Sequence, residues 1–134
     1  MTGYAQLLTH LVGDYWLQSD WMAVNKTKRT IPCLIHILIY TLVFAVVGYF
    51  SGGISLIQLA IIGGSHFLID RFALPKYLIW GKNKILSPPG SCRPWRDCNA
   101  TGFDPARPLF VSVWLLIICD NILHLLINFF ALSM

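Results

Sequence analysis

The sequence predicts an all-α fold, a four-helix transmembrane bundle with one long basic cytoplasmic loop. Of the 134 residues, 56% are hydrophobic and only 12% are charged, whereas a typical soluble domain carries roughly 25% charged residues. The apolar residues also gather in long uninterrupted stretches. A soluble monomer and a disordered chain are both excluded, because neither keeps so much apolar surface in water. We therefore interpret residues 1–134 as a single membrane domain.

Three apolar stretches are long enough for membrane-spanning helices, because about 20 residues cross the roughly 30 Å hydrocarbon core. They are residues 31–50, 54–80 and 109–133. Pro75 is expected to kink or end the second of these helices. Residues 4–24 form a fourth, more polar helix, which could span the membrane, re-enter it or lie at its surface. It lacks the basic start and the small-residue cleavage site of a signal peptide.

The positions of the basic residues predict the orientation in the membrane. All ten Lys and Arg residues lie within residues 26–29 and 71–107. Loops rich in Lys and Arg face the cytoplasm, so the loops 25–30 and 81–107 are predicted to be cytoplasmic and both termini to lie outside. This topology accounts for the net charge of +4 without a nucleic-acid partner.

Histidine and aspartate recur at helical spacing inside the apolar stretches. Three pairs lie four residues apart: His10 and Asp14, His66 and Asp70, and Asp120 and His124. Residues four apart share one face of a helix. An Asp in mid-membrane costs roughly 2.5–3.5 kcal/mol on insertion scales, so each carboxylate should have a compensating interaction. His36 adds an imidazole from the remaining helix, and Gln18 extends the stripe begun by His10 and Asp14.

This set of side chains predicts a metal centre inside the bundle, since helix bundles build such centres from facing carboxylates and imidazoles. The six paired residues are the predicted ligands of a divalent transition metal, zinc, manganese or iron. Their number suits two ions better than one four-coordinate ion. His36, predicted to be a further ligand or a general acid, and Gln18, predicted to orient a substrate, are the candidate catalytic residues. His36 lies only about 8 Å from Ile31 along its helix, so it is expected to be shallower than the pairs.

Two other interpretations of the His and Asp pairs stay open. In one, the protein is a proton or ion relay or a transporter that uses the same side chains without a fixed metal ion. Such a protein would form a homo-oligomer, because four short helices enclose little room for a pore. In the other, the pairs only join the helices through hydrogen bonds, and the chain is a non-catalytic interaction protein of a phage or bacterial membrane.

The basic residues suggest a substrate class for the enzyme hypothesis. Four of them are predicted to hold an anionic head group at the cytoplasmic face: Arg71, Lys76, Arg93 and Arg96. Such head groups favour basic side chains near the membrane surface. The expected partners are therefore the lipid bilayer and an anionic lipid or lipid-linked phosphate.

The stretch His10-Leu-Val-Gly-Asp14-Tyr-Trp-Leu-Gln18 resembles a motif of small bacterial and phage integral membrane proteins of unknown function. The resemblance continues through His36, His66-Phe-Leu-Ile-Asp70-Arg and Asp120-x-x-x-His124. More remotely, the pattern is similar to bacterial membrane-bound metal-dependent hydrolases, which are themselves similar to zinc phospholipase C-type phosphoesterases. These resemblances imply metal-assisted phosphoester hydrolysis at the bacterial inner membrane.

Overall fold

The computed structural model describes residues 1–134, and all of its regular structure is helical. In chain order the elements are α1 (Gly3–Leu11), the π-helix η1 (Val12–Trp16), α2 (Asp20–Asn25), α3 (Thr30–Phe50), α4 (Leu56–Phe72), α5 (Leu74–Leu86), α6 (Trp95–Cys98) and α7 (Leu109–Leu132). The chain divides into two compact units, residues 1–72 with 124–134, and residues 73–123. Helix α7 contributes its first part to the second unit and its end to the first.

Two helices are long and apolar enough to cross a membrane, α3 with 21 residues and α7 with 24. Helices α4 and α5 provide a third candidate only if they are counted together as one broken span. Leu38 and Leu42 on α3 are well exposed, as expected of a helix that faces lipid rather than water. The chain is therefore a candidate membrane protein, and the sides on which its loops and termini lie stay predictions.

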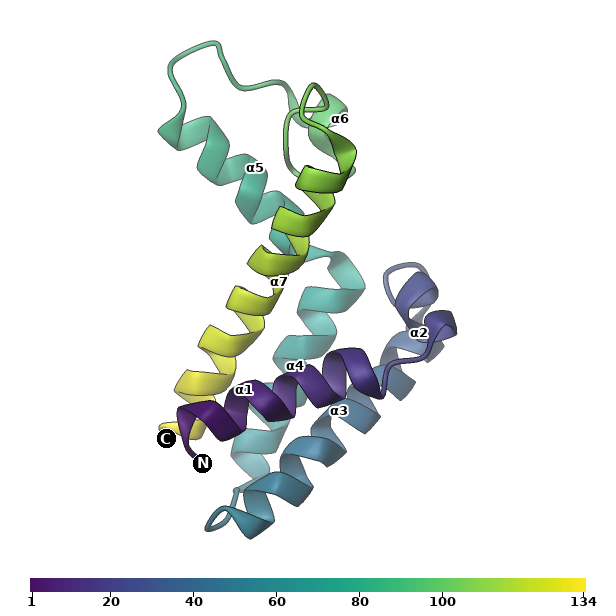
Figure 1. The fold of residues 1–134 in the computed structure, drawn as a ribbon, viewed down its shortest axis with the longest axis vertical. Helices are drawn as coiled ribbons and strands as arrows, with labels where there is room; N and C mark the ends of the chain where they lie inside the picture. The colour runs from purple at the N-terminus through teal and green to yellow at the C-terminus, as the bar shows by residue number, and fades with distance from the viewer. The chain divides into compact units, whose positions relative to one another are not determined.

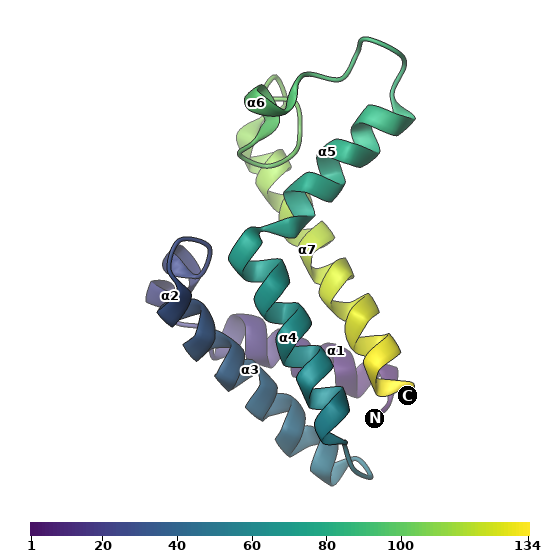
Figure 2. The same ribbon diagram turned by 180° about the vertical axis from the view of Figure 1, so that it is seen from behind.

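In the first unit, α3 and α4 lie side by side and α1 runs across them (Figures 1 and 2). Their core is formed by Tyr40 and Phe44 from α3, Ile62 from α4 and Ala131 from the end of α7. Gly13 permits the close approach of η1 to α3, because a Cβ there would lie 2.8 Å from Cδ2 of Tyr40.

The helix predicted over residues 4–24 is interrupted in the structure. Helix α1 continues into η1, which ends at Trp16, and α2 begins only at Asp20. Ser19 ends the interruption, because its Oγ accepts a hydrogen bond from the backbone N–H of Met22 at 3.4 Å and so caps α2. With α1 crossing α3 and α4, the predicted bundle of four spanning helices is not confirmed.

The helix predicted over residues 54–80 is also broken. Ser55 and Gln58 form a reciprocal cap at the start of α4, with N···O distances of 3.2 and 2.8 Å. The helix ends at Phe72, and Ala73 has a left-handed backbone with φ 49°. Pro75 explains the break, because its ring has no N–H to continue the hydrogen-bonding of α4. Helix α5 then continues to Leu86, inside the predicted loop.

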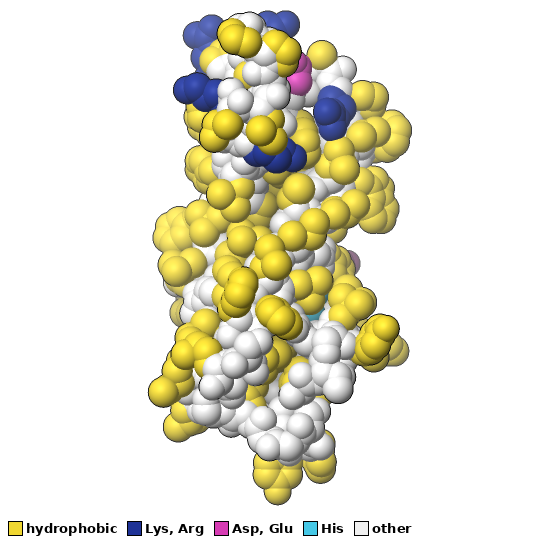
Figure 3. Space-filling view, turned by 90° about the vertical axis from the view of Figure 1, so that its left-hand side faces the viewer, with side chains coloured by type: hydrophobic (Ala, Val, Ile, Leu, Met, Phe, Trp, Pro, Cys, Tyr) yellow, Lys and Arg dark blue, Asp and Glu magenta, His cyan; other side chains and the backbone are white.

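The second unit orders much of the predicted loop 81–107 against α5. The indole N–H of Trp80 donates to the carbonyl of Arg93 at 3.1 Å, and Ile79, Cys98 and Phe103 are buried. Gly102 has φ 82°, and a Cβ at this position would collide with the backbone of α5. On the face shown in Figure 3, the Lys and Arg side chains gather over this unit, and hydrophobic side chains cover much of the rest.

Candidate metal centre

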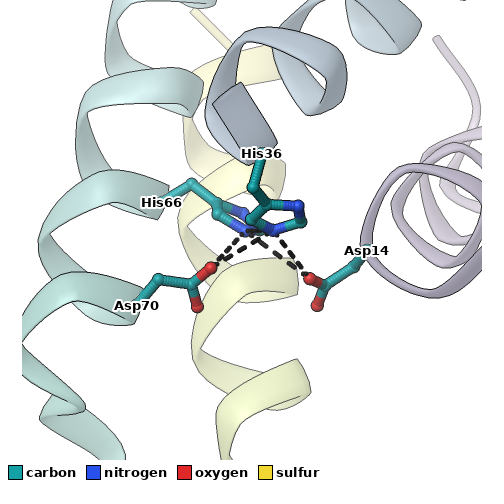
Figure 4. A group of neighbouring side chains, drawn as sticks. All are labelled: Asp14, His36, His66 and Asp70. Carbon is teal, nitrogen blue, oxygen red and sulfur yellow. Dashed lines mark hydrogen bonds and ion pairs between the residues drawn. The ribbon is translucent and has the colours of Figure 1, made fainter. Parts of the chain in front are cut away.

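Four buried side chains meet within the first unit (Figure 4). Asp14 comes from η1, His36 from α3, and His66 and Asp70 from α4. The two imidazoles have no exposed surface, and each aspartate is 3% exposed. His66 and Asp70 share one face of α4 because they are four residues apart. The two carboxylates approach the paired imidazoles from opposite sides.

The facing atoms of these side chains are closely and evenly spaced. Nε2 of His36 lies 3.0 Å from Nε2 of His66. Oδ2 of Asp70 lies 3.2 Å from the first of these nitrogens and 3.1 Å from the second. Oδ1 of Asp14 lies 3.1 Å from Nε2 of His36 and 3.7 Å from Nε2 of His66. Four ligands of a tetrahedral zinc ion with bonds near 2.0–2.1 Å are about 3.3–3.4 Å apart. The four residues could therefore hold one metal ion.

Lys26 brings a positive charge to the same two carboxylates. Its Nζ lies 2.9 Å from Oδ2 of Asp70 and 3.4 Å from Oδ1 of Asp14. The lysine side chain is 15% exposed. A buried carboxylate is costly unless a charged or hydrogen-bonding group compensates it. Lys26 provides that compensation, and its ammonium contacts the oxygen atoms that face the two imidazoles.

His10 and His124 face the second oxygen of each carboxylate. Nε2 of His10 lies 3.8 Å from Oδ2 of Asp14, and Nε2 of His124 lies 3.5 Å from Oδ1 of Asp70. The ring of His124 also stacks on that of His66, with 3.9 Å between their centroids. These two histidines therefore orient the carboxylates from outside the central group of four, as second partners of metal ligands commonly do.

Tyr40 connects this outer layer to α7. Its hydroxyl accepts a hydrogen bond from Nδ2 of Asn128 at 2.7 Å and lies 2.8 Å from Nδ1 of His10. With its single proton donated to Nδ1 of His10, the ring would carry its own proton on Nε2, which faces Asp14. The Tyr40 ring also lies 3.8 Å from the ring of His66, centroid to centroid. Tyr40 thus contacts the central imidazole of His66 and also His10, which faces the Asp14 carboxylate.

A close contact between α3 and α4 brings His36 and His66 together. A Cβ added to Gly63, which lies three residues before His66, would be only 2.6 Å from Oγ1 of Thr41 on α3. Glycine at this position therefore allows α3 and α4 to pack closely, whereas any larger residue would push the two helices apart. Helix pairs in membranes approach closely at small residues for the same reason.

The structure brings six of the seven predicted His and Asp residues into the first unit: His10, Asp14, His36, His66, Asp70 and His124. Asp120 lies one turn before His124 but in the second unit, where it is partly exposed. His36 is central rather than shallower than the pairs, so the depth expectation is wrong. The expectation compared the number of residues from the end of each helix. That comparison holds only for parallel helices, and α1 runs across α3 and α4.

The other predicted site residues are dispersed. Oε1 of Gln18, after η1, is buried without a hydrogen-bond partner. Nη1 of Arg71 donates to the carbonyl of Thr27 at 2.6 Å and so joins the end of α4 to the loop before α3. Lys76, Arg93 and Arg96 belong to the other unit. Nζ of Lys76 there lies over two aromatic rings, those of Tyr77 and Trp95.

Sequence reasoning missed Lys26 and Tyr40. Tyr40 follows His36 by four residues, so the spacing that identified the His and Asp pairs could have identified it as well. Lys26 has no periodic signal, because it lies on the turn after α2 and reaches the carboxylates only through the packing of α2 against α3.

The family model of DUF3307, described as a protein of unknown function, matches residues 4–86. No curated protein and no solved structure matches the chain. The match agrees with the expected family of unknown function and gives no support to the hydrolase resemblance. The matched segment contains the central group of four and Lys26, whereas His124 and Asn128 lie beyond it.

Proposed function

Because the chain belongs to DUF3307, a family of proteins of unknown function, we propose a function from the buried His and Asp residues themselves. The protein is a membrane hydrolase that uses a divalent metal ion to cleave a phosphate ester of a lipid or lipid-linked substrate. The observation that carries this proposal is the spacing of four buried ligand atoms, which all lie within 4.8 Å of one another, with 3.0–3.7 Å between each central imidazole nitrogen and the other nitrogen or a carboxylate oxygen. Zinc binds imidazole and carboxylate donors of this kind, and manganese and iron accept the same donors.

Three of the four residues make the tightest set. His36, His66 and Asp70 have mutual distances of 3.0, 3.1 and 3.2 Å, and two imidazoles with one carboxylate leave a position for water in catalytic sites. Asp14 is the looser member, at 3.7 Å from His66. We assign His36, His66 and Asp70 as ligands and Asp14 as the general base beside the open position.

The reaction follows from these assignments. A divalent ion would lower the pKa of a water molecule and stabilise negative charge on a phosphoryl oxygen. Asp14 accepts a proton from the attacking water, whose oxygen forms a bond to phosphorus. The bond between phosphorus and the ester oxygen breaks, and that oxygen takes the proton held by Asp14 and leaves as the alcohol. His10, facing Asp14, keeps the carboxylate oriented throughout.

Lys26 would neutralise the phosphoryl group. The Lys26 ammonium contacts both carboxylates. A metal ion bound to Asp70 would displace this ammonium, which could then contact the phosphoryl group of the substrate. Lysine binds phosphate as a point charge. A lipid is the natural substrate class because the buried residues come from a chain with candidate membrane spans.

The metal content of the detergent-purified, full-length protein tests the proposal. Elemental analysis should find about one equivalent of transition metal in the wild type and in Asp20→Asn, which removes an exposed carboxylate on α2. His66→Gln and Asp70→Asn should lose the metal while still eluting as folded protein. Phosphate-bearing lipids can then be screened as substrates, with Asp14→Asn expected to retain metal and lose hydrolysis. Folded wild type without metal, even after zinc or manganese is added, would exclude the hydrolase.

A proton relay is the second candidate, favoured by one observation. Exchangeable groups follow one another from the Tyr40 hydroxyl through His10 to Asp14, with separations of 2.8 and 3.8 Å, and then to His36 at 3.1 Å. A relay would operate without metal. Proton flux into vesicles carrying metal-free protein, abolished by His10→Ala, would favour the relay over the hydrolase.

A further inference from the structure

We propose that α5 lies along the membrane surface and binds the head groups of anionic lipids. This interaction is separate from the metal centre and does not depend on it. The helix has 13 residues, or about 20 Å at 1.5 Å per residue, and therefore cannot cross a hydrocarbon core of roughly 30 Å by itself. A helix of this length suits a buried, re-entrant or interfacial position.

Helix α5 presents an apolar stripe on its exposed side. Leu78 and Ile85 are two turns apart on the same face, and they are 57% and 81% exposed. Leu74, one turn before Leu78, extends the stripe. The helix uses a different face for packing within its unit, because Ile79 is only 2% exposed. The exposed stripe is therefore not required by the core of this unit.

Two lysines flank the stripe. At about 100° per residue, Lys82 falls on one side of the line through Leu78 and Ile85, and Lys84 falls on the other. Nζ of Lys84 lies 5.0 Å from the centroid of the Trp80 ring. An apolar stripe bordered by lysines and aromatic rings is the pattern of a helix lying in the head-group region, where the long side chains reach the phosphates.

The surrounding segment selects anionic rather than neutral lipids. Residues 73–96 contain no acidic residue, and their basic residues are Lys76, Lys82, Lys84, Arg93 and Arg96. Arg96 pairs with Asp97 at 3.5 Å, which leaves four basic side chains for the lipid. Figure 3 shows Lys and Arg side chains gathered over this unit. Each basic residue near an anionic membrane surface contributes attraction of about 1 kcal/mol. The charge complements a negative leaflet, and the stripe complements the acyl chains just below the phosphates.

Amide hydrogen exchange on full-length protein in lipid nanodiscs tests the position of α5. The amides of residues 74–86 should exchange several-fold more slowly in nanodiscs that contain phosphatidylglycerol than in nanodiscs of phosphatidylcholine alone. Leu78→Gln with Ile85→Gln, both at exposed positions, should remove this difference without affecting exchange in α3. Equal exchange in the two lipids would overturn the proposal. Complete protection in both would also overturn it, since α5 would then lie in the hydrocarbon as part of a broken span.

Lipid retention measures the charge contribution independently. Native mass spectrometry of the full-length protein, incubated with equal amounts of phosphatidylglycerol and phosphatidylcholine, should show preferential retention of the anionic lipid. Lys82→Gln with Lys84→Gln should reduce that retention roughly tenfold or more. The matched control is Lys28→Gln with Arg29→Gln, which removes the same charge from an exposed turn of the first unit. An equal loss in both double variants would mean that net charge, and not α5, recruits the lipid.

Discussion

Nζ of Lys26 lies 2.9 Å from Oδ2 of Asp70, the oxygen that also lies 3.2 and 3.1 Å from the central imidazole nitrogens of His36 and His66. The lysine ammonium and a metal ion would therefore use the same carboxylate atom. This relationship makes Lys26 the internal cation of the centre. Its replacement should have opposite effects on stability and on metal affinity.

Lys26→Met is expected to lower the stability of the metal-free protein by roughly 1–3 kcal/mol, because two buried carboxylates would then face each other without the ammonium. The same change should tighten metal binding by about tenfold, since the ion no longer displaces a competing charge. Thermal unfolding and competition with a chromophoric chelator, both in detergent, measure the two effects. Lys28→Met, at an exposed position two residues away, should change neither. Weaker metal binding by Lys26→Met would contradict the inference that Lys26 and the metal ion compete for the same carboxylate oxygen.

Gly63→Ala should separate α3 from α4 and weaken the centre. The added methyl would lie 2.6 Å from Oγ1 of Thr41, and overpacking of this kind costs about 1–3 kcal/mol. Because His66 is one turn further along α4, its distance to His36 should grow and metal affinity should fall. Gly64→Ala is the matched control, since a Cβ there has nothing within 4 Å. Its melting temperature should be unchanged or slightly higher, and equal effects at the two glycines would refute the close-contact argument.

Tyr40→Phe should destabilise the first unit by about 1–3 kcal/mol, because the buried Asn128 amide and His10 ring each lose the hydroxyl they contact. Loss of the partner that orients His10 should also slow hydrolysis about 10- to 100-fold with metal retained, because His10 orients the general base Asp14. Tyr49→Phe, at a position 76% exposed on the same helix, provides the control. If Tyr40→Phe melts earlier but hydrolyses the substrate as fast as the wild type, the hydroxyl supports only packing.

Cys98 should react slowly with thiol reagents. Burial raises the pKa of the Cys98 thiol above its ordinary value, because the thiolate is poorly solvated there. The thiolate is the reactive form, so alkylation should remain slow at neutral pH and should increase as the pH rises. Mass spectrometry of the alkylated protein should find the more exposed Cys92 modified first. Gly102→Ala, which would push the loop away from α5, should accelerate the reaction at Cys98. Rapid alkylation of Cys98 in the wild type would contradict its burial.

The sequence alone was sufficient to predict the features that depend on residues close together along the chain. The apolar runs 31–50 and 109–133 correspond closely to α3 and α7, because a long apolar stretch with no proline beyond its first turn has few alternatives to a helix. Pro75 marked the break between α4 and α5 for a covalent reason. The pairing of His66 with Asp70 followed from helical spacing.

Packing between helices decided the composition of the centre. The π-helix and the interruption before Asp20 turn Asp14 toward α3 and bring Lys26 to the carboxylates, although neither residue has a periodic relation to His36. The central position of His36 likewise depends on how α1 crosses α3 and α4. Spacing along one chain determines which side chains share a face of a helix. Which faces meet is determined by the close approach at Gly63 and by the burial of charge, and these exist only once the helices have packed together.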